Sequence, residues 1–213
     1  MKPTNATRTL LLAHGLKIAT EKGLRGVVVR VVATSAGVNL GSFVYHFGNR
    51  ERFLEELVEL WYAPMYGRMK LTAEANDYRS ALEGLQATLF QLVEIISQNT
   101  SFITNLLADA AAGERAAQVF LLNIPSRHPK LLLELIARAQ AEGSIIQETP
   151  VHLIMFVMSS VGFPLLLAGG TWKLRDWLPE GASAFKQFIS NPDRARQRLS
   201  WALKGICIQG EAP

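Results

Sequence analysis

The chain has 213 residues, of which 49% are hydrophobic and 19% are charged. This composition is that of a folded globular protein, which excludes a disordered chain, and a chain of this length can bury a core without disulfide bonds. The single cysteine, Cys207, excludes an intrachain disulfide, and the apolar run near the N-terminus is too interrupted for a signal peptide. We therefore expect a cytoplasmic protein.

Charge is distributed unevenly along the chain. Residues 1–50 contain seven basic residues and one acidic residue, Glu21, which gives a net charge of +6. Residues 51–213 contain 15 basic and 17 acidic residues, which gives −2. A basic N-terminal segment on a slightly acidic body indicates a polyanionic partner for that segment, with chance clustering as the alternative.

The spacing of apolar residues predicts helices from the N-terminus onward. The first helix begins at Thr7 or Thr9 and runs to about Lys22, where Gly23 ends it. The β-branched run 27–32 taken alone also fits a strand, but the residues around it favour a helix.

A long helix is expected to begin near Asn49, and Pro64 should kink it or end its first part. Further helices are expected over the rest of the chain, at about 78–98, 101–112, 114–123, 129–142, 151–170, 184–189 and 192–209. The predicted fold class is therefore all-α.

The segment 29–47 has the pattern of a helix-turn-helix. Ala33 supplies the small side chain that two steeply crossing helices need where they meet, and Gly37 tolerates the positive φ of a tight turn. Asn39 is suited to cap the second helix, which spans about Leu40 to Phe47. A second helix in this arrangement lies in the major groove of DNA.

The second helix offers several residues for contact with DNA. Its exposed positions are expected to be Leu40, Gly41, Ser42, Val44 and Tyr45. Ser42 and Tyr45 can form hydrogen bonds to bases or phosphates, and Leu40 and Val44 can touch thymine methyl groups. Arg50, just beyond the helix, is placed to contact a phosphate.

The same region carries a wider pattern, made by Gly23, by Val32-Ala33 with Ala36-Gly37-Val38, and by the run 41–53, GSFVYHFGNRERF. Over about residues 8–57 this pattern resembles the tetracycline-repressor (TetR) family of bacterial regulators. The resemblance implies a three-helix helix-turn-helix DNA-binding domain at 1–50. It also implies a larger helical domain at 51–213 that binds a small effector and dimerises through its last two helices.

The resemblance also places individual residues at or beside DNA-contacting positions. These are Asn39, Leu40, Ser42, Tyr45, His46 and Arg50. For His46 the alternative is a structural role, with its ring packed under the third helix.

Four positions depart from the family pattern. Val44 stands where Tyr is usual, which removes one phosphate donor, and Val28 stands where Thr or Ser usually provides a helix cap worth about 1 kcal/mol. Arg50 stands where Lys is usual, and Val31 where a polar residue is common. These changes bear on DNA affinity more than on the fold.

The segment 151–170 contains no Asp, Glu, Lys or Arg and is long enough to span a bilayer. Its interruptions by His152, Ser159, Ser160 and Pro164, together with the family resemblance, favour a helix buried between the core and a dimer partner. We therefore expect no membrane association, and a four-helix dimer interface formed with the last helix.

Bulky apolar side chains recur through the body, and a subset is expected to enclose a hydrophobic or aromatic effector. The subset, with one hydroxyl group, is Trp61, Met65, Phe90, Phe102, Leu106, Phe120, Met155, Met158 and Ser159. Gln86, Asn105 and Asp109 are further candidates for orienting the ligand. Ordinary core packing is the alternative for most of these residues.

The sequence shows no pattern of catalytic or metal-binding residues. Its four histidines are scattered, and none has a partner at metal-ligand spacing. The run 159–162 lacks the glycine that precedes a nucleophilic serine, and no glycine-rich phosphate loop is present. We predict no enzyme, no cofactor and no metal.

These observations predict a ligand-responsive transcriptional regulator, most simply a repressor. It would bind a near-palindromic operator in double-stranded DNA as a homodimer and be controlled by a small hydrophobic or aromatic effector. The first alternative is a helical ligand-binding or interaction protein on the same scaffold with weakened or lost DNA binding. The second is a membrane-associated protein that uses 151–170.

Overall fold

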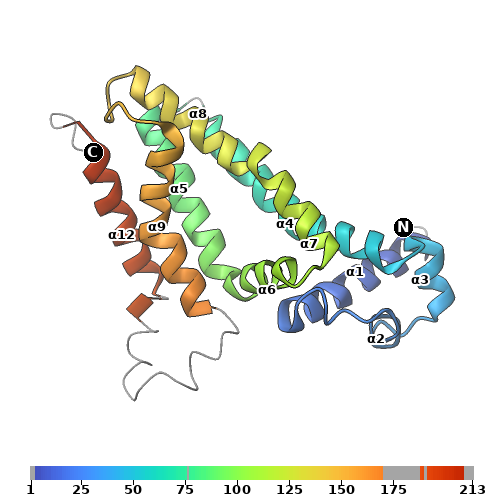
Figure 1. The fold of residues 1–213 in the computed structure, drawn as a ribbon. Coiled ribbons are helices and arrows are strands. Elements are labelled where there is room, and N and C mark those ends of the chain that lie inside the picture. Colours follow the sequence, from blue (N-terminus) through green and yellow to red (C-terminus); the bar gives the residue numbers. More distant parts are fainter. Residues whose placement is uncertain (1–2, 76, 170–187, 190, 209–213) are drawn as a thin grey trace, which may run out of the picture. The chain divides into compact units, whose positions relative to one another are not determined.

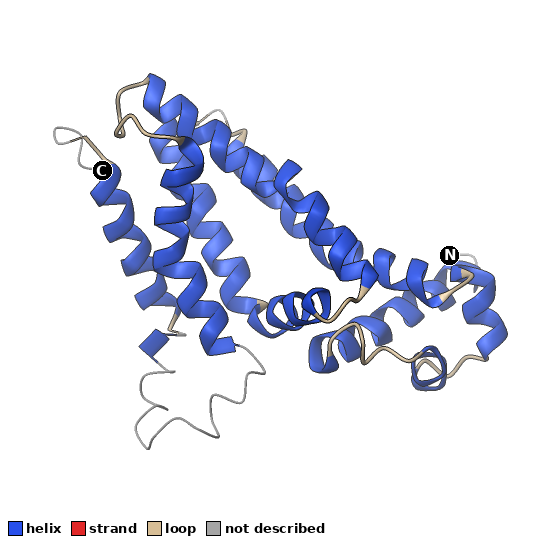
Figure 2. Ribbon diagram, in the orientation of Figure 1, coloured by secondary structure: helices blue, strands red, loops and turns tan. Residues whose placement is uncertain are grey.

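The computed structural model of the protein describes residues 3–75, 77–169, 188–189 and 191–208, and these residues are mainly helical (Figures 1 and 2). The principal helices are α1 (Pro3–Lys22), α2 (Val29–Ser35), α3 (Leu40–Phe47), α4 (Arg50–Ala73), α5 (Ala81–Gln98), α6 (Thr100–Ala111), α7 (Arg115–Asn123), α8 (His128–Ala141), α9 (Pro150–Gly169) and α12 (Pro192–Ile206). A short 3₁₀ helix, η1, spans Ile124–Ser126. The all-α fold class is confirmed.

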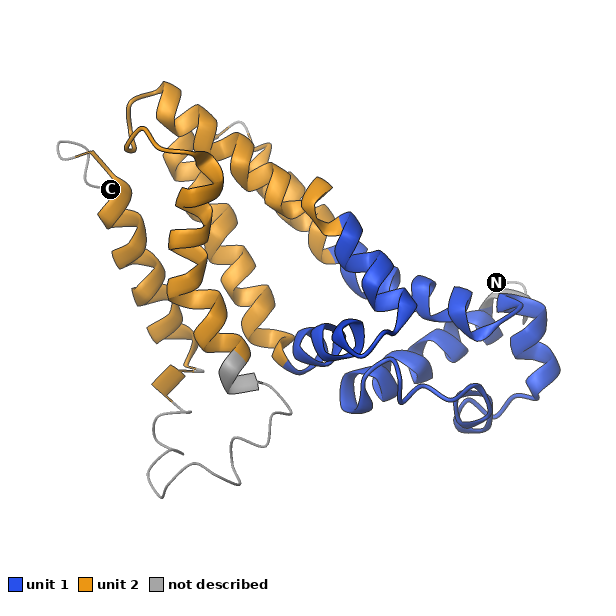
Figure 3. Ribbon diagram, in the orientation of Figure 1, with its two compact units in different colours: residues 1–64, 101–123 blue, residues 65–100, 124–213 orange. Residues whose placement is uncertain are grey.

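The chain divides into two compact units (Figure 3). Unit 1 comprises residues 1–64 and 101–123, and unit 2 comprises 65–100 and 124–213. Unit 1 contains the predicted DNA-binding segment 1–50 and, in addition, the first part of α4 together with α6 and α7.

The core of unit 1 is organised around three aromatic rings. Phe43 and Phe47 extend from α3, and Phe53 extends from α4. Their ring centroids lie 4.8 to 5.3 Å apart, and all three side chains are buried. Edge-on and tilted contacts of this kind fix the orientation of α3 more tightly than aliphatic packing alone.

Unit 2 is a helical bundle in which α5 packs against α8, α9 and α12, and α9 also packs against α12 (Figure 1). Its buried side chains are almost all aliphatic, as the helical spacing of apolar residues predicts. They include Leu85, Leu89, Leu132, Ile136, Val161, Leu165, Leu199 and Leu203.

Several helix boundaries differ from those predicted. Helix α1 begins at Pro3 rather than at Thr7 or Thr9, because proline is well suited to the first turn, where its missing N–H is not needed. Helix α4 continues through Pro64, so of the two alternatives, a kink or an end of the helix, the end is wrong. Tyr62 and Met65 on either side of Pro64 are buried, and the helix spans the position where proline removes one backbone hydrogen bond.

The strand alternative for 27–32 is wrong, because α2 begins at Val29. Val32, Ala33 and Ala36 are buried, whereas Val28 and Val31 are about half exposed, which is helical rather than alternating burial. The helix predicted near 184–189 lies mostly outside the described residues. Among the helices that are described, none has the length and apolarity needed to cross a membrane.

Candidate nucleic-acid interface

Helices α2 and α3 are joined by the predicted tight turn. Gly37 has a φ of +67°, a conformation that side-chain-bearing residues rarely adopt. The amide of Gly37 donates to Thr34 O at 3.0 Å, and the amide of Val38 donates to Ala33 O at 3.0 Å. Ala33 is almost fully buried, so the small residue and the glycine occupy the places that a helix-turn-helix requires.

The predicted cap of α3 is confirmed. The side-chain Oδ1 of Asn39 accepts a hydrogen bond from the backbone amide of Ser42 at 2.8 Å and a second one from the Ser42 hydroxyl at 3.2 Å. The Asn39 side chain is exposed and that of Ser42 is partly exposed. The cap thereby gives α3 a fixed first turn and leaves polar groups for contact with DNA.

Of the positions on α3 that we expected to be exposed, Leu40, Gly41, Val44 and Tyr45 are exposed and Ser42 is only partly exposed. Tyr45 is 76% exposed, Val44 52% and Leu40 43%, whereas Phe43 and Phe47 on the opposite face are buried. A short helix that presents large side chains outward while its inner face is packed has the form of a recognition helix.

His46 is intermediate between these two faces. It is partly exposed, and its ring lies edge-on to that of Tyr45, with 5.1 Å between the ring centroids and an interplanar angle of 77°. This position is compatible with contact to DNA and with a packing role, so both interpretations of His46 remain.

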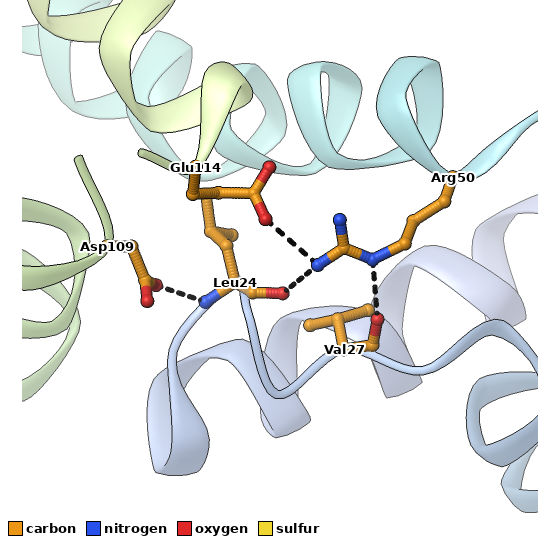
Figure 4. Close-up of polar contacts among 5 residues, drawn as sticks. All are labelled: Leu24, Val27, Arg50, Asp109 and Glu114. Atoms are coloured by element: carbon orange, nitrogen blue, oxygen red, sulfur yellow. Dashed lines mark hydrogen bonds and ion pairs between the residues drawn. The ribbon is translucent and has the colours of Figure 1, made fainter. Parts of the chain in front are cut away.

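We had expected the Arg50 side chain to extend toward a DNA phosphate. Instead, it forms hydrogen bonds within unit 1. Its Nε donates to Val27 O at 3.0 Å, and its Nη2 donates to Leu24 O at 2.8 Å (Figure 4). The same Nη2 lies 3.0 Å from Oε2 of Glu114. This role of Arg50 could not be predicted from neighbouring residues, because Glu114 lies 64 positions further along the chain.

Asn105 and Asp109, which we had considered as orienting groups for an effector, are engaged elsewhere. Oδ2 of Asp109 accepts a hydrogen bond from the amide of Leu24 at 2.5 Å, and Nδ2 of Asn105 donates to Thr20 O at 3.0 Å. Burial raises the pKa of the Asp109 carboxyl, and hydrogen bonds from the amides of Leu24 and Arg25 partly oppose that shift. Both side chains hold the end of α1 and the loop after it.

The residues predicted to bind an effector fall into both units. Unit 1 brings together Trp61, Phe102 and Phe120, with Tyr62 as a fourth ring from outside the predicted effector-binding subset. The Trp61 and Phe102 ring centroids are 4.3 Å apart. Leu106, also in unit 1, is buried.

The other predicted effector residues lie in unit 2, and they differ in burial. Met65 is buried, and Phe90 and Met158 are partly exposed. Met155 is 65% exposed, and Ser159 is exposed with its hydroxyl donating to Phe156 O at 2.9 Å. These two α9 residues lie on the surface of this chain rather than in its core.

A pocket of about 280 Å³ lies between α5 and α12. Its lining is partly charged and consists of Val93, Glu94, Ser97, Gln98, Pro192, Asp193 and Arg196. It contains none of the residues predicted to bind an apolar effector.

Comparison with known proteins is consistent with this geometry. The model of the family described as "Bacterial regulatory proteins, tetR family" matches residues 11–57. The HTH-type transcriptional repressor KstR2 of Mycobacterium tuberculosis H37Rv is 30% identical over 209 residues, which cover 97% of this chain and 96% of the relative. KstR2 of Rhodococcus jostii RHA1 is 24% identical over 200 residues, which cover 93% of this chain and 90% of the relative.

Solved structures share the fold. The ketosteroid transcriptional regulator KstR2 of Mycobacterium tuberculosis superposes with a TM-score of 0.63 and 20% identity in the structural alignment, which covers 95% of each chain. The SmeT–triclosan complex superposes with a TM-score of 0.70 and 17% identity, covering 98% of this chain and 95% of SmeT.

The chain belongs to the TetR family of DNA-binding transcriptional regulators. Its relatives are transcriptional regulators rather than enzymes.

Proposed function

We propose that the protein is a repressor that binds a near-palindromic operator as a homodimer and responds to a small hydrophobic or aromatic effector. The observation that carries the proposal is the outer face of α3, where Leu40, Val44 and Tyr45 are exposed on a helix fixed by the Asn39 cap. In our assignment residues 1–50 form the DNA-binding domain, and residues 51–213 bind the effector and dimerise.

The proposed DNA contacts come from α3 and its cap. They are Asn39, Leu40, Gly41, Ser42, Val44, Tyr45 and His46. The polar groups among them read base edges or phosphates, and the apolar groups contact thymine methyl groups. Arg50 is not in this set, because its Nε and Nη2 are committed to acceptors within unit 1.

The proposed dimer interface is the exposed apolar surface of α9 and α12. Met155, Phe156, Phe163 and Trp201 are each more than half exposed in the single chain. Apolar side chains grouped in this way on two adjacent helices are typical of a protein–protein contact, and a two-fold axis through them would form a four-helix interface. Two copies of α3 would then meet two half-sites about one DNA turn apart.

The proposed effector is hydrophobic or aromatic. The aromatic cluster of Trp61, Tyr62, Phe102 and Phe120 supplies flat apolar surfaces of the kind that such ligands pack against. KstR2 of Mycobacterium tuberculosis is a ketosteroid transcriptional regulator, so ketosteroids are the first ligands to screen. Thermal-shift measurements should show stabilisation by an apolar polycycle, whereas no shift with any apolar compound would exclude this class of effector.

The DNA-binding proposal is tested by fluorescence anisotropy with an operator selected from genomic fragments. Tyr45→Ala and Ser42→Ala should each weaken operator binding, Tyr45→Ala by about tenfold or more, because a lost base contact costs about 1–3 kcal/mol. Leu71→Ala is the matched control, since Leu71 is 74% exposed on α4 outside the proposed surface. Unchanged binding by both α3 variants would favour the alternative of an interaction protein on the same scaffold.

A further inference from the structure

The loop 23–28 between α1 and α2 is held by groups from outside the helix-turn-helix. Gly23 turns the chain with a φ of +75°, and the side chains of Leu24 and Val27 are fully buried. The amide of Leu24 is bound by Asp109, and the carbonyls of Leu24 and Val27 are bound by Arg50 (Figure 4). Three backbone groups of this loop are therefore bound from α4 and α6, whereas the amides of Gly26 and Val27 donate to carbonyls within the loop.

The loop leads directly into α2, whose own cap is weak. Val28 occupies the N-cap position and makes no side-chain cap hydrogen bond. The residue before it, Val27, is bound through its carbonyl by Arg50. The start of α2 is thus positioned by a long-range contact where a helix usually relies on a local one.

The α6–α7 segment supplies the acidic side of this arrangement. The amide of Glu114 donates to Asp109 O at 2.8 Å, which ties the two acidic residues together through a turn at Gly113 with a φ of +87°. Nε of Arg115 lies 2.8 Å from Oε1 of Glu51 in the first turn of α4, which adds a second ion pair beside that of Glu114 and Arg50. All these residues belong to unit 1.

The chemistry of Arg50 suits this role. Its guanidinium binds two carbonyls and one carboxylate at once, and a planar fork of N–H donors is required to do so. Lysine, with a single nitrogen at the end of a flexible stem, does not reproduce that arrangement. The Glu114 carboxylate is only 10% exposed, so the pair is less screened than a surface ion pair.

We propose that Arg50, Asp109 and Glu114 form a loop clamp that sets the affinity for DNA without contacting DNA. The clamp holds loop 23–28, and with it the start of α2, against α6 and α7. Its three members are positioning residues. By this proposal α6 and α7 belong to the same rigid part of unit 1 as the helix-turn-helix that binds DNA. This inference rests on the proposed function.

The test compares clamp variants with the wild type in operator binding at several salt concentrations, at a temperature at which every variant is folded. Glu114→Gln and Arg50→Lys should weaken binding about 3- to 30-fold and leave the slope of log affinity against log salt unchanged. If Arg50 contacted a phosphate directly, Arg50→Ala would instead make that negative slope shallower by about one. Glu134→Gln, which breaks the exposed Lys130–Glu134 pair in unit 2, is the matched control and should bind as the wild type does.

Two further measurements separate positioning from general destabilisation. The double variant Arg50→Ala/Glu114→Ala should bind the operator only slightly more weakly than Arg50→Ala alone. The reason is that each of the two substitutions removes the same Arg50–Glu114 ion pair. Hydrogen exchange should become faster at the amide of Leu24 in Asp109→Ala, while the amides of α5 in unit 2 keep their wild-type rates.

The outcomes distinguish the clamp from the proposed function. If the wild type binds an operator and Glu114→Gln and Asp109→Ala bind it with the same affinity, the clamp is overturned and the proposed function stands. A salt slope reduced in Arg50→Ala with no effect of Glu114→Gln would overturn it in favour of a phosphate contact. Wild type that binds no DNA would overturn both.

Discussion

Gly15 of α1 lies directly against the ring of Phe53 in α4. A methyl group on Gly15 would overlap Cζ of Phe53 and lie 2.6 Å from Cδ1 of Leu57. Phe53 and Leu57 are fully buried, and the rings of Phe43 and Phe47 hold Phe53 in place. Glycine costs about 1 kcal/mol inside a helix relative to alanine, so its presence here follows from packing in unit 1.

Gly15→Ala should therefore lower the stability of unit 1 by about 1–2 kcal/mol, because overpacking outweighs the gain in helix propensity. Thermal denaturation monitored by circular dichroism measures the change. Gly67→Ala in α4 is the matched control: apart from the adjacent residues and the backbone of its own helix, nothing lies within 4 Å of the added methyl, so this variant should be more stable than the wild type. A rise in the midpoint for both variants would contradict the packing described for Gly15.

Restoring a side-chain cap at the start of α2 should raise the stability of the protein, in contrast to Gly15→Ala. Val28 has extended backbone angles, φ −98° and ψ 122°, which are those of an N-cap residue. Val28→Thr should stabilise the protein by about 1 kcal/mol, because the threonine oxygen can accept from a free amide in the first turn of α2. Val31→Thr, at a similarly exposed site inside α2, should give no such gain. Equal midpoints for the two threonine variants would argue against the cap.

We expect the free energy of unfolding to depend on pH because of His128 at the start of α8. Burial, aided by Arg127, lowers the pKa of His128 to about 4 from 6.5. Between these values the unfolded chain binds a proton that the folded chain does not, so folded-state stability falls as pH drops from about 6.5 towards 4. The loss is at most about 1.4 kcal/mol per pH unit.

His128→Gln should flatten this part of the stability profile. Denaturant titrations at pH 7, 6, 5 and 4.5 compare the variant with the wild type, and His152→Gln, at an exposed position, serves as the control. If the wild type and His128→Gln lose stability in parallel over this range, His128 is not the residue responsible.

The dimer interface is tested by Phe163→Glu. Phe163 is 65% exposed on α9, and a carboxylate there would be buried without a partner in the proposed dimer. Sedimentation equilibrium should show a monomer, with operator affinity reduced because each half-site is then bound separately. Leu122→Glu, at an 80% exposed position on α7, should remain dimeric. A Phe163→Glu variant that stays dimeric would place the interface elsewhere.

The parts of the site that the sequence predicted are those determined by neighbouring residues. The Gly37 turn and the Asn39 cap act over three or four positions, so the identity of the residues was sufficient to locate them. The exposed face of α3 was predicted from the positions within the helix, and Leu40, Val44 and Tyr45 are exposed there.

The parts that the sequence did not predict depend on contacts between distant segments. The Asp109–Leu24 hydrogen bond spans 85 positions, and the Arg50–Glu114 pair spans 64. A polar residue in an apolar helix shows that a partner is needed, but a single sequence does not show which one. For that reason Asp109 was assigned to the effector and Arg50 to a phosphate.

The central claim, that α3 reads an operator, is tested most directly by selection of binding sites from genomic fragments with the purified protein at two salt concentrations. The account predicts enrichment of a near-palindrome with half-sites about 10 base pairs apart, and loss of that enrichment in Tyr45→Ala. Enrichment of no sequence, or of the same sequence with equal strength by Tyr45→Ala, would contradict it.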